Sequence, residues 1–137
     1  MKQLIVKGVQ CTLDDNEYWE MGNGKVVIAN GVLTTLATQF NIPEPEYEVI
    51  EHVRDFSTDK FSYIVQATLH MANDKTITEI GEANHLNCLN AIALQYPCIS
   101  AKTRAGSRVL IRALGLQGQV YSENEIDKNT LNNKKSA

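Results

Sequence analysis

Several features common in catalytic, secreted or membrane proteins are scarce in this sequence of 137 residues. The longest apolar runs are a few residues, whereas a bilayer-spanning helix needs roughly 20. The first residues, MKQLIVKGVQ, lack the apolar region and cleavage site of a signal peptide, so we expect a cytoplasmic protein with no membrane contact.

Metal ligands and catalytic signatures are also scarce. The three cysteines and three histidines form no C-x-x-C or H-x-x-x-H spacing, so no zinc site is expected and the thiols are predicted to be free. The run Gly22-Asn23-Gly24-Lys25 is followed by two valines and not by Ser or Thr, which makes it a turn and not a phosphate loop. We therefore expect no enzymatic activity and no cofactor.

What is present is an uneven distribution of charge. Residues 1–96 contain 6 Lys/Arg and 13 Asp/Glu, residues 97–118 contain 4 and 0, and residues 119–137 contain 3 of each. The only strongly basic segment is therefore AKTRAGSRVLIRALG, residues 101–115. In an acidic chain, such a segment is a candidate contact for a polyanion.

The periodicity predicts an α+β domain. A short strand at Leu4–Val9, a hairpin around Gly22–Gly24 and a helix beginning near Asn30 are followed by three strands. The three strands are expected at residues 47–56, 61–71 and 76–82 as an antiparallel meander. The resulting β-β-β-α core, preceded by a strand or hairpin and a helix, has its helices packed on one face of the sheet.

Two helices are expected after the meander, over residues 86–95 and from Pro97 to a stop at Gly115. In the second, the side chains expected to face the sheet are Ile99, Gly106, Leu110, Ala113 and Leu114. Arg104, Arg108 and Arg112 recur every four residues and are expected to form a row on the opposite side. Residues 1–118 are predicted to form the domain, and residues 119–137 a flexible polar tail with a possible capping box at Ser122 and Glu125.

Three segments in this order resemble the Rad fifty-two family of single-strand annealing proteins. They are KVVIANGVL with the following Leu36-Ala37, the strand pair KFSYIVQATLHMANDKTITEIGEAN, and the closing helix A-x-T-R-A-x-x-R-x-L-I-R-A-L-G. The resemblance covers roughly residues 24–118 and implies ATP-independent binding of single-stranded DNA, annealing in recombination and repair, and homo-oligomeric rings or filaments. By position, it implies that Arg108 and Arg112 hold the DNA backbone.

The predicted DNA contacts combine the resemblance with the charge pattern. Arg104, Arg108 and Arg112 are expected to contact phosphates with help from Lys102, and Arg54 and Lys60 to line the same groove on the wetter face of the sheet with Gln66, Thr68 and His70. Two alternatives remain open. One is a single-stranded DNA-binding protein that protects DNA without annealing it, and the other is a self-associating protein-interaction domain whose arginines pair with acidic surfaces.

Overall fold

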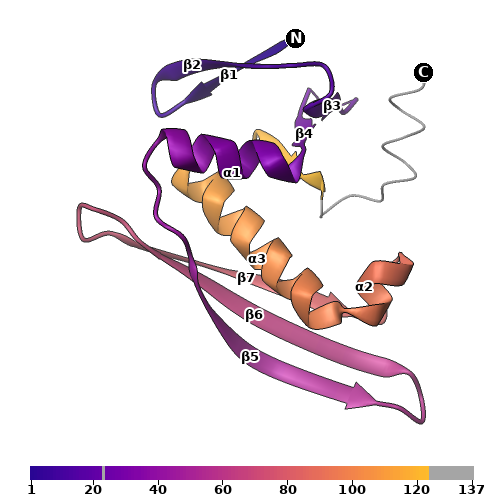
Figure 1. The fold of residues 1–137 in the computed structure, drawn as a ribbon. Coiled ribbons are helices and arrows are strands. Elements are labelled where there is room, and N and C mark those ends of the chain that lie inside the picture. The colour runs from indigo at the N-terminus through magenta and orange to yellow at the C-terminus, as the bar shows by residue number, and fades with distance from the viewer. Residues whose placement is uncertain (23, 124–137) are drawn as a thin grey trace. The chain divides into compact units, whose positions relative to one another are not determined.

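The computed structural model describes residues 1–22 and 24–123, and within them the fold is α+β, as predicted (Figure 1). The described elements, in chain order, are β1 (Lys2–Val6), β2 (Val9–Leu13), β3 (Tyr18–Glu20), β4 (Val26–Ile28), α1 (Asn30–Gln39), β5 (Glu46–Asp55), β6 (Lys60–His70), β7 (Thr76–Asn84), α2 (Ala91–Gln95), α3 (Pro97–Ala113) and β8 (Val120–Ser122).

The chain divides into two compact units, where a single domain over residues 1–118 was expected. The first unit comprises Met1–Ile42 and Leu110–Ala137, and the second comprises Pro43–Val109. The second unit is thus continuous in sequence, and the first is assembled from both ends of the chain.

The first unit begins with a hairpin that replaces the single expected strand at Leu4–Val9. β1 pairs antiparallel with β2, with Val6 opposite Val9. The two residues between the strands, Lys7 and Gly8, both have positive φ, at 50° and 82°. Such a pair of left-handed residues is the geometry of a tight two-residue hairpin turn.

A second small sheet in the first unit has the strand order β3-β4-β8. β3 and β4 form the antiparallel hairpin expected around Gly22–Gly24. β8 pairs with β4 in parallel, and Val120 and Ser122 are buried. The fold therefore continues past Gly118, where the tail was expected to begin. Residues 124–137, including the Glu125 of the expected capping box, lie outside the described residues.

Helix α1 begins at Asn30, and Ala29 occupies its N-cap position without a side-chain cap. The backbone N–H of Asn30 instead donates to Oε1 of Glu123 at 2.8 Å, and Ser122 Oγ lies 3.2 Å from Asn30 Oδ1. A carboxylate at this position satisfies a free helix N–H and interacts favourably with the helix dipole.

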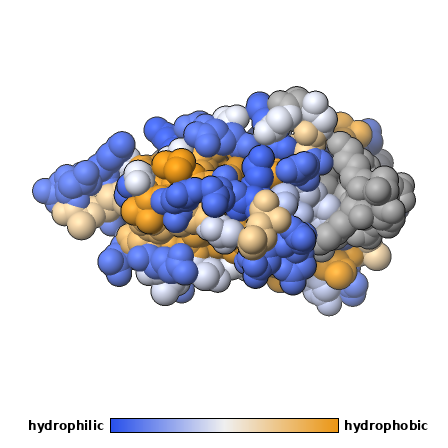
Figure 2. Space-filling model, turned by 90° about the horizontal axis from the view of Figure 1, so that it is seen from above, coloured by the Kyte–Doolittle hydropathy of each residue, from blue (hydrophilic) through white to orange (hydrophobic). Residues whose placement is uncertain are grey.

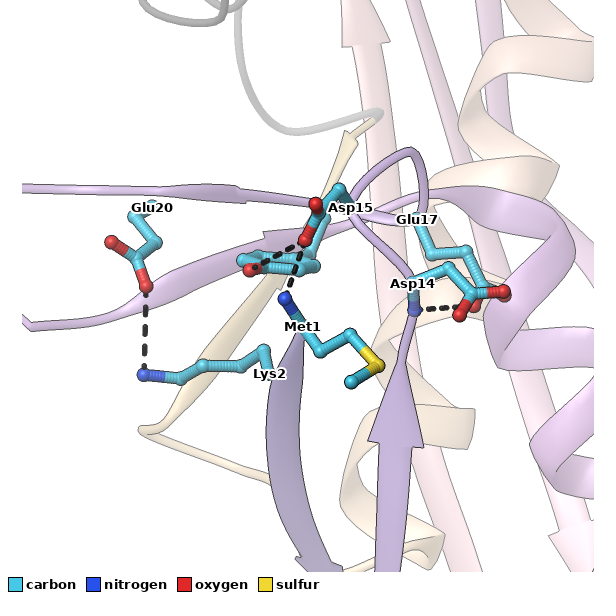
Figure 3. Close-up of polar contacts among 7 residues, drawn as sticks. Met1, Lys2, Asp14, Asp15, Glu17 and Glu20 are labelled. Atoms are coloured by element: carbon cyan, nitrogen blue, oxygen red, sulfur yellow. Dashed lines mark hydrogen bonds and ion pairs between the residues drawn. The ribbon is translucent and has the colours of Figure 1, made fainter.

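Polar contacts join residues of the amino-terminal segment of the first unit to one another (Figure 3). The amino group of Met1 lies 2.5 Å from Asp15, the backbone N–H of Asp14 donates to Glu17 at 2.8 Å, and Lys2 lies 3.9 Å from Glu20. These groups are largely exposed, so the ion pairs contribute little to stability. Hydrophilic residues, drawn in blue, cover much of the surface seen in Figure 2, with apolar residues between them.

The second unit contains the three-stranded antiparallel meander that the sequence predicts, in the order β5-β6-β7. The part of α3 up to Val109 lies along one face of this sheet (Figure 1). The side chains of β6 alternate, with Phe61, Val65, Ala67 and Leu69 buried on the face toward α3. We call this the helix side of the sheet and the opposite face the outer side.

Small residues set the approach of α3 to the sheet. A Cβ placed on Gly81 of β7 would lie only 2.1 Å from the carbonyl oxygen of Ala101 and 2.3 Å from the backbone nitrogen of Ala105. Ala101 and Ala105 are fully buried, whereas Ile99, which was expected to face the sheet, is 62% exposed. The helix is therefore rotated from the expected orientation so that alanines, and not the larger apolar side chains, meet β7.

Candidate nucleic-acid interface

Strand β5 is an edge strand whose ten residues are all exposed. It pairs with β6 from Glu46 opposite Thr68 to Asp55 opposite Lys60, with an irregularity between Val49 and Glu51. Ile50 is the extra residue at this β-bulge, and it has no partner on β6. A bulge of one residue reverses the alternation of side chains beyond it.

The bulge sorts the charged side chains of β5 by sign. Residues directly opposite in an antiparallel pair share a face, so the pairings with β6 assign each side chain of β5. The helix side carries Tyr47, Val49, His52 and Arg54, opposite Ala67, Val65, Tyr63 and Phe61. The outer side carries every carboxylate of the strand, namely Glu46, Glu48, Glu51 and Asp55. Without the bulge, Glu51 and Asp55 would share a face with Tyr47.

Cations and aromatic rings meet at both ends of the helix side of β5. At its start, Lys102 Nζ of α3 lies 4.8 Å from the centre of the Tyr47 ring. At its end, the Arg54 guanidinium lies 5.3 Å from the rings of both Phe56 and Phe61. We name the set Tyr47, Val49, His52, Arg54 and Lys102 the β5 track, which extends for about 20 Å along the strand.

The phenol of Tyr47 stays uncharged well above neutral pH. Partial burial of the Tyr47 ring, and secondarily the negative charge of Glu44, raise the pKa of Tyr47 above its usual value. The phenol therefore adds no negative charge to the β5 track under physiological conditions.

The structure separates two residues that the sequence placed in one groove. Arg54 lies on the helix side of the sheet, whereas Lys60, Gln66, Thr68 and His70 alternate onto the outer side. His70 faces Glu46 there, with 3.3 Å between Nε2 and the carboxylate. The cause is again the bulge, because strict alternation along β5 would place Arg54 with Glu46 and Glu48.

The expected row of outward-facing arginines is also corrected. Arg104 donates to the carbonyl oxygens of Glu82 at 2.6 Å and Asn87 at 3.0 Å, and to Asn87 Oδ1 at 2.8 Å. Arg108 donates to the carbonyl oxygen of Ile80 at 2.6 Å. Both side chains are half-buried and reach the free edge of β7, because the alanines of α3 turn them there.

These bonds have an electrostatic consequence for Arg104. The oxygens that accept hydrogen bonds from Arg104 belong to neutral groups. They therefore occupy N–H donors of the guanidinium without cancelling its positive charge. Lys102 and Arg112 are exposed on α3, Arg112 in its last turn within the first unit. Of the six predicted contacts, the structure brings Lys102 and Arg54 onto one continuous face of the second unit.

Tyr47 and His52 complete this face, and sequence reasoning did not select them. Strict alternation assigns the side chains of β5 beyond residue 49 to the wrong face of the sheet. The sequence EYEVIEHVRD contains no residue that marks the position of the bulge. The signal available was the presence of Tyr47, His52 and Arg54 on one strand that also contains several carboxylates.

The described part of the chain contains neither a metal-binding cluster nor a membrane-spanning helix. No group of three or more His, Cys, Asp or Glu side chains there is arranged to hold a metal ion. None of the described helices combines the length and apolar character needed to cross a membrane. Comparisons with family models, curated proteins and solved structures find no match to the chain.

Proposed function

We propose that this protein binds single-stranded DNA along the β5 track and promotes annealing of complementary strands without ATP or a chemical step. The observation that carries the proposal is the sorting of charge across β5, with cations and aromatic rings on one face and every carboxylate of the strand on the other. A single strand offers phosphates to cations and bases to aromatic rings.

The chemistry of the β5 track suits a loosely held, extended strand. Lys102 and Arg54 at its two ends are suited to contact phosphates, and the Tyr47 ring beside Lys102 offers a surface for stacking. None of these contacts reads a base edge, so binding is expected to be independent of sequence. Annealing requires such binding, because the bases of the held strand must remain available to a complement.

The proposal retains the annealing activity and homo-oligomeric assembly implied by the family resemblance, and it moves the main DNA contact. Arg104 and Arg108 become residues that hold α3 to β7, and Arg104 adds positive potential near the DNA. One β5 track makes few contacts, so useful affinity requires several copies acting on one strand.

The test is a fluorescence-anisotropy titration of a labelled oligonucleotide over a salt series. We expect Arg54→Gln with Lys102→Gln to weaken binding by about tenfold or more and to reduce the salt slope by about 1.4, since each lost phosphate contact removes about 0.7 from the slope for single strands. Lys60→Gln is the matched control for each of the two single variants, because it also removes one positive charge, from the outer side of the hairpin that contains Arg54.

Equal losses from Lys60→Gln and from a track variant would contradict the β5 track as the binding face. Absence of binding at low salt would contradict DNA binding altogether. An annealing assay with complementary oligonucleotides then separates the two activities, since binding without faster annealing indicates a protein that only protects single strands. An RNA oligonucleotide of the same sequence, titrated in parallel, tests the preference for DNA.

A further inference from the structure

The segment between β7 and the second turn of α3 exposes an unusual number of large apolar side chains. Six of them are between 44% and 78% exposed: Leu86, Leu89, Ile92, Leu94, Tyr96 and Ile99. We name this set the 86–99 patch. Monomeric soluble proteins seldom expose apolar groups at this density, and such patches are commonly binding surfaces.

The local structure explains why these side chains do not enter the core. Helix α2 has only five residues, and only Ala93 among them is buried. Asn90 caps the helix by accepting from the backbone N–H of Ala93 at 2.8 Å, which fixes the segment in this conformation. Because the Asn90 cap fixes the backbone of this segment, its exposed apolar side chains form an ordered surface that a partner can contact.

The residues that flank the 86–99 patch in the sequence include no carboxylates. No Asp or Glu occurs between residues 83 and 122, and this stretch contains Lys102 and Arg104. Lys102 follows Ile99 by three residues on α3, so the two lie on neighbouring parts of the helix surface. The 86–99 patch is therefore apolar with basic residues at its margin.

The outer side of the sheet has the complementary character. Ile64 of β6 lies between Glu51 of β5 and Glu82 of β7 in the strand pairings, and Ile80 is directly opposite Gln66, which pairs with Glu48. Ile80 is 41% exposed and Ile64 is half-buried. We name Ile64 and Ile80, with the surrounding Glu48, Glu51 and Glu82, the outer-side island.

We infer that the 86–99 patch of one copy docks on the outer-side island of a second copy. Apolar groups meet apolar groups at the centre, and basic residues at the margin of one surface meet the glutamates around the other. A second copy is the partner that both surfaces indicate, because one chain carries the two complementary halves of the contact.

Two different surfaces make this a head-to-tail contact, which repeats until it closes into a ring or extends as a filament. The inference deepens the proposed function by naming the contact between copies. The outer-side island lies on the face of the sheet opposite the β5 track, so docking there leaves Tyr47, His52 and Arg54 accessible, while Lys102 adjoins both the β5 track and the 86–99 patch. A second copy is not expected to add a strand at the edge of β7, because the carbonyl oxygens of Glu82 and Ile80 there already accept hydrogen bonds from Arg104 and Arg108.

The experiment measures the mass of the full chain by sedimentation and light scattering in the absence of DNA. Wild type is expected to be oligomeric, and Leu89→Glu with Ile92→Glu to be monomeric. Ile80→Lys, at the centre of the outer-side island, is also expected to be monomeric. All three positions are exposed, and circular dichroism checks that each variant remains folded. Ile5→Glu is the control, because Ile5 is 59% exposed in β1 and lies outside both surfaces.

Mixing the two monomeric variants gives the sharpest result. Each retains one intact surface, so an equimolar mixture is expected to form a heterodimer and to stop there. A monomeric wild type, an oligomeric Ile80→Lys variant or a mixture that stays monomeric would each overturn the inference. The oligomeric Ile80→Lys result would indicate that the 86–99 patch pairs with itself. Because no DNA is present, these outcomes are independent of whether the β5 track binds DNA.

Discussion

At the scale of single residues, one glycine controls how closely α3 approaches its sheet. Gly81 leaves room for the backbone of α3 at Ala101 and Ala105, and no side chain of the helix needs to move aside. The nearest atoms on α3 belong to the backbone, so no side chain could rotate away to make room for a larger residue at position 81. This makes position 81 far more sensitive than its place on an edge strand suggests.

Replacing Gly81 with alanine is expected to destabilise the protein by about 3 kcal/mol or more, because the new Cβ overlaps α3 backbone atoms and the helix must shift. Thermal or urea unfolding measures the change. Gly31→Ala is the matched control: Gly31 lies in α1 with no atom near its would-be Cβ. There the same substitution is expected to stabilise the helix by up to about 1 kcal/mol. Equal effects at both positions would contradict the close approach.

The three free cysteines are predicted to differ in reactivity. Burial raises the pKa of the Cys88 thiol, and the nearby Arg104 guanidinium offsets only part of that increase. Cys88 therefore remains protonated and unreactive near neutral pH, whereas Cys11 and Cys98 are half-buried.

Alkylation at pH 8 followed by peptide mass spectrometry is expected to modify Cys88 more slowly than Cys11 and Cys98, and to modify all three at similar rates in urea. Fast modification of Cys88 in the folded protein would contradict this environment. The raised pKa of Cys88 also makes the stability of the folded protein depend on pH. A raised thiol pKa favours the folded state below the ordinary cysteine value, and this contribution decreases as pH rises above that value.

At the scale of single elements, the bulge in β5 determines what each face of the sheet displays. Because Ile50 has no partner on β6, the side chains on either side of it keep their faces only while the bulge holds, and single substitutions test those faces. Val49→Glu places a carboxylate in the β5 track, whereas Val53→Glu places one on the outer side, opposite Ser62. DNA affinity is expected to decrease by about tenfold or more in Val49→Glu, since a carboxylate then opposes phosphates along the β5 track. Val53→Glu is the matched control, because Val49 and Val53 are 48% and 54% exposed, and it is expected to bind as wild type. Equal binding by the two variants would contradict charge sorting as the basis of binding.

The edge of β7 depends on Arg104. Arg104→Gln removes donors from two backbone carbonyls and from Asn87, with an expected loss of about 1–3 kcal/mol in unfolding free energy. Lys102→Gln removes the same charge from the same helix and a cation–π contact of about 0.5–1 kcal/mol. A larger stability loss at Lys102, measured by urea unfolding, would reverse the assigned roles.

The sequence predicts the elements of the second unit well and their faces less well. Alternation in β6 and the Pro97 and Gly115 boundaries of α3 are strong local signals, and the structure confirms them. The orientation of α3 could not be predicted in the same way, because it depends on the space left by Gly81 on a different element. Likewise, the candidate cations are visible in the sequence, but the bulge that separates Arg54 from Lys60 is not.

Two elements of the first unit were missed for a different reason. The turn between β1 and β2 uses Lys7-Gly8, which lacks the Asn-Gly or Asp-Gly signature of common hairpins. β8 has only three residues and owes its existence to pairing with β4, far away in sequence. Neither element has the length or local pattern that periodicity detects.

At the scale of the whole molecule, residues 119–123 belong to the fold and not to a tail. A chain ending after Gly118 loses β8, the parallel partner of β4, and the Glu123 carboxylate that accepts from the start of α1. Its first unit is expected to be less stable by several kcal/mol than that of a chain ending after Glu123, because buried backbone groups of β4 lose their partners. Thermal unfolding of the two chains decides the point, and equal midpoints would contradict a structural role for β8.

The parallel pairing of β4 with β8 also has a consequence for the order of events on the ribosome. The second unit occupies one uninterrupted stretch, Pro43–Val109, and its strands pair only with near neighbours. The first unit is translated first but cannot complete its β3-β4-β8 sheet until Ser122 has emerged. Domains generally fold in the order in which they are synthesised. Here the second unit, although it follows β4 in the sequence, is expected to fold before the sheet that contains β4, because β4 stays without its parallel partner until Ser122 has been synthesised.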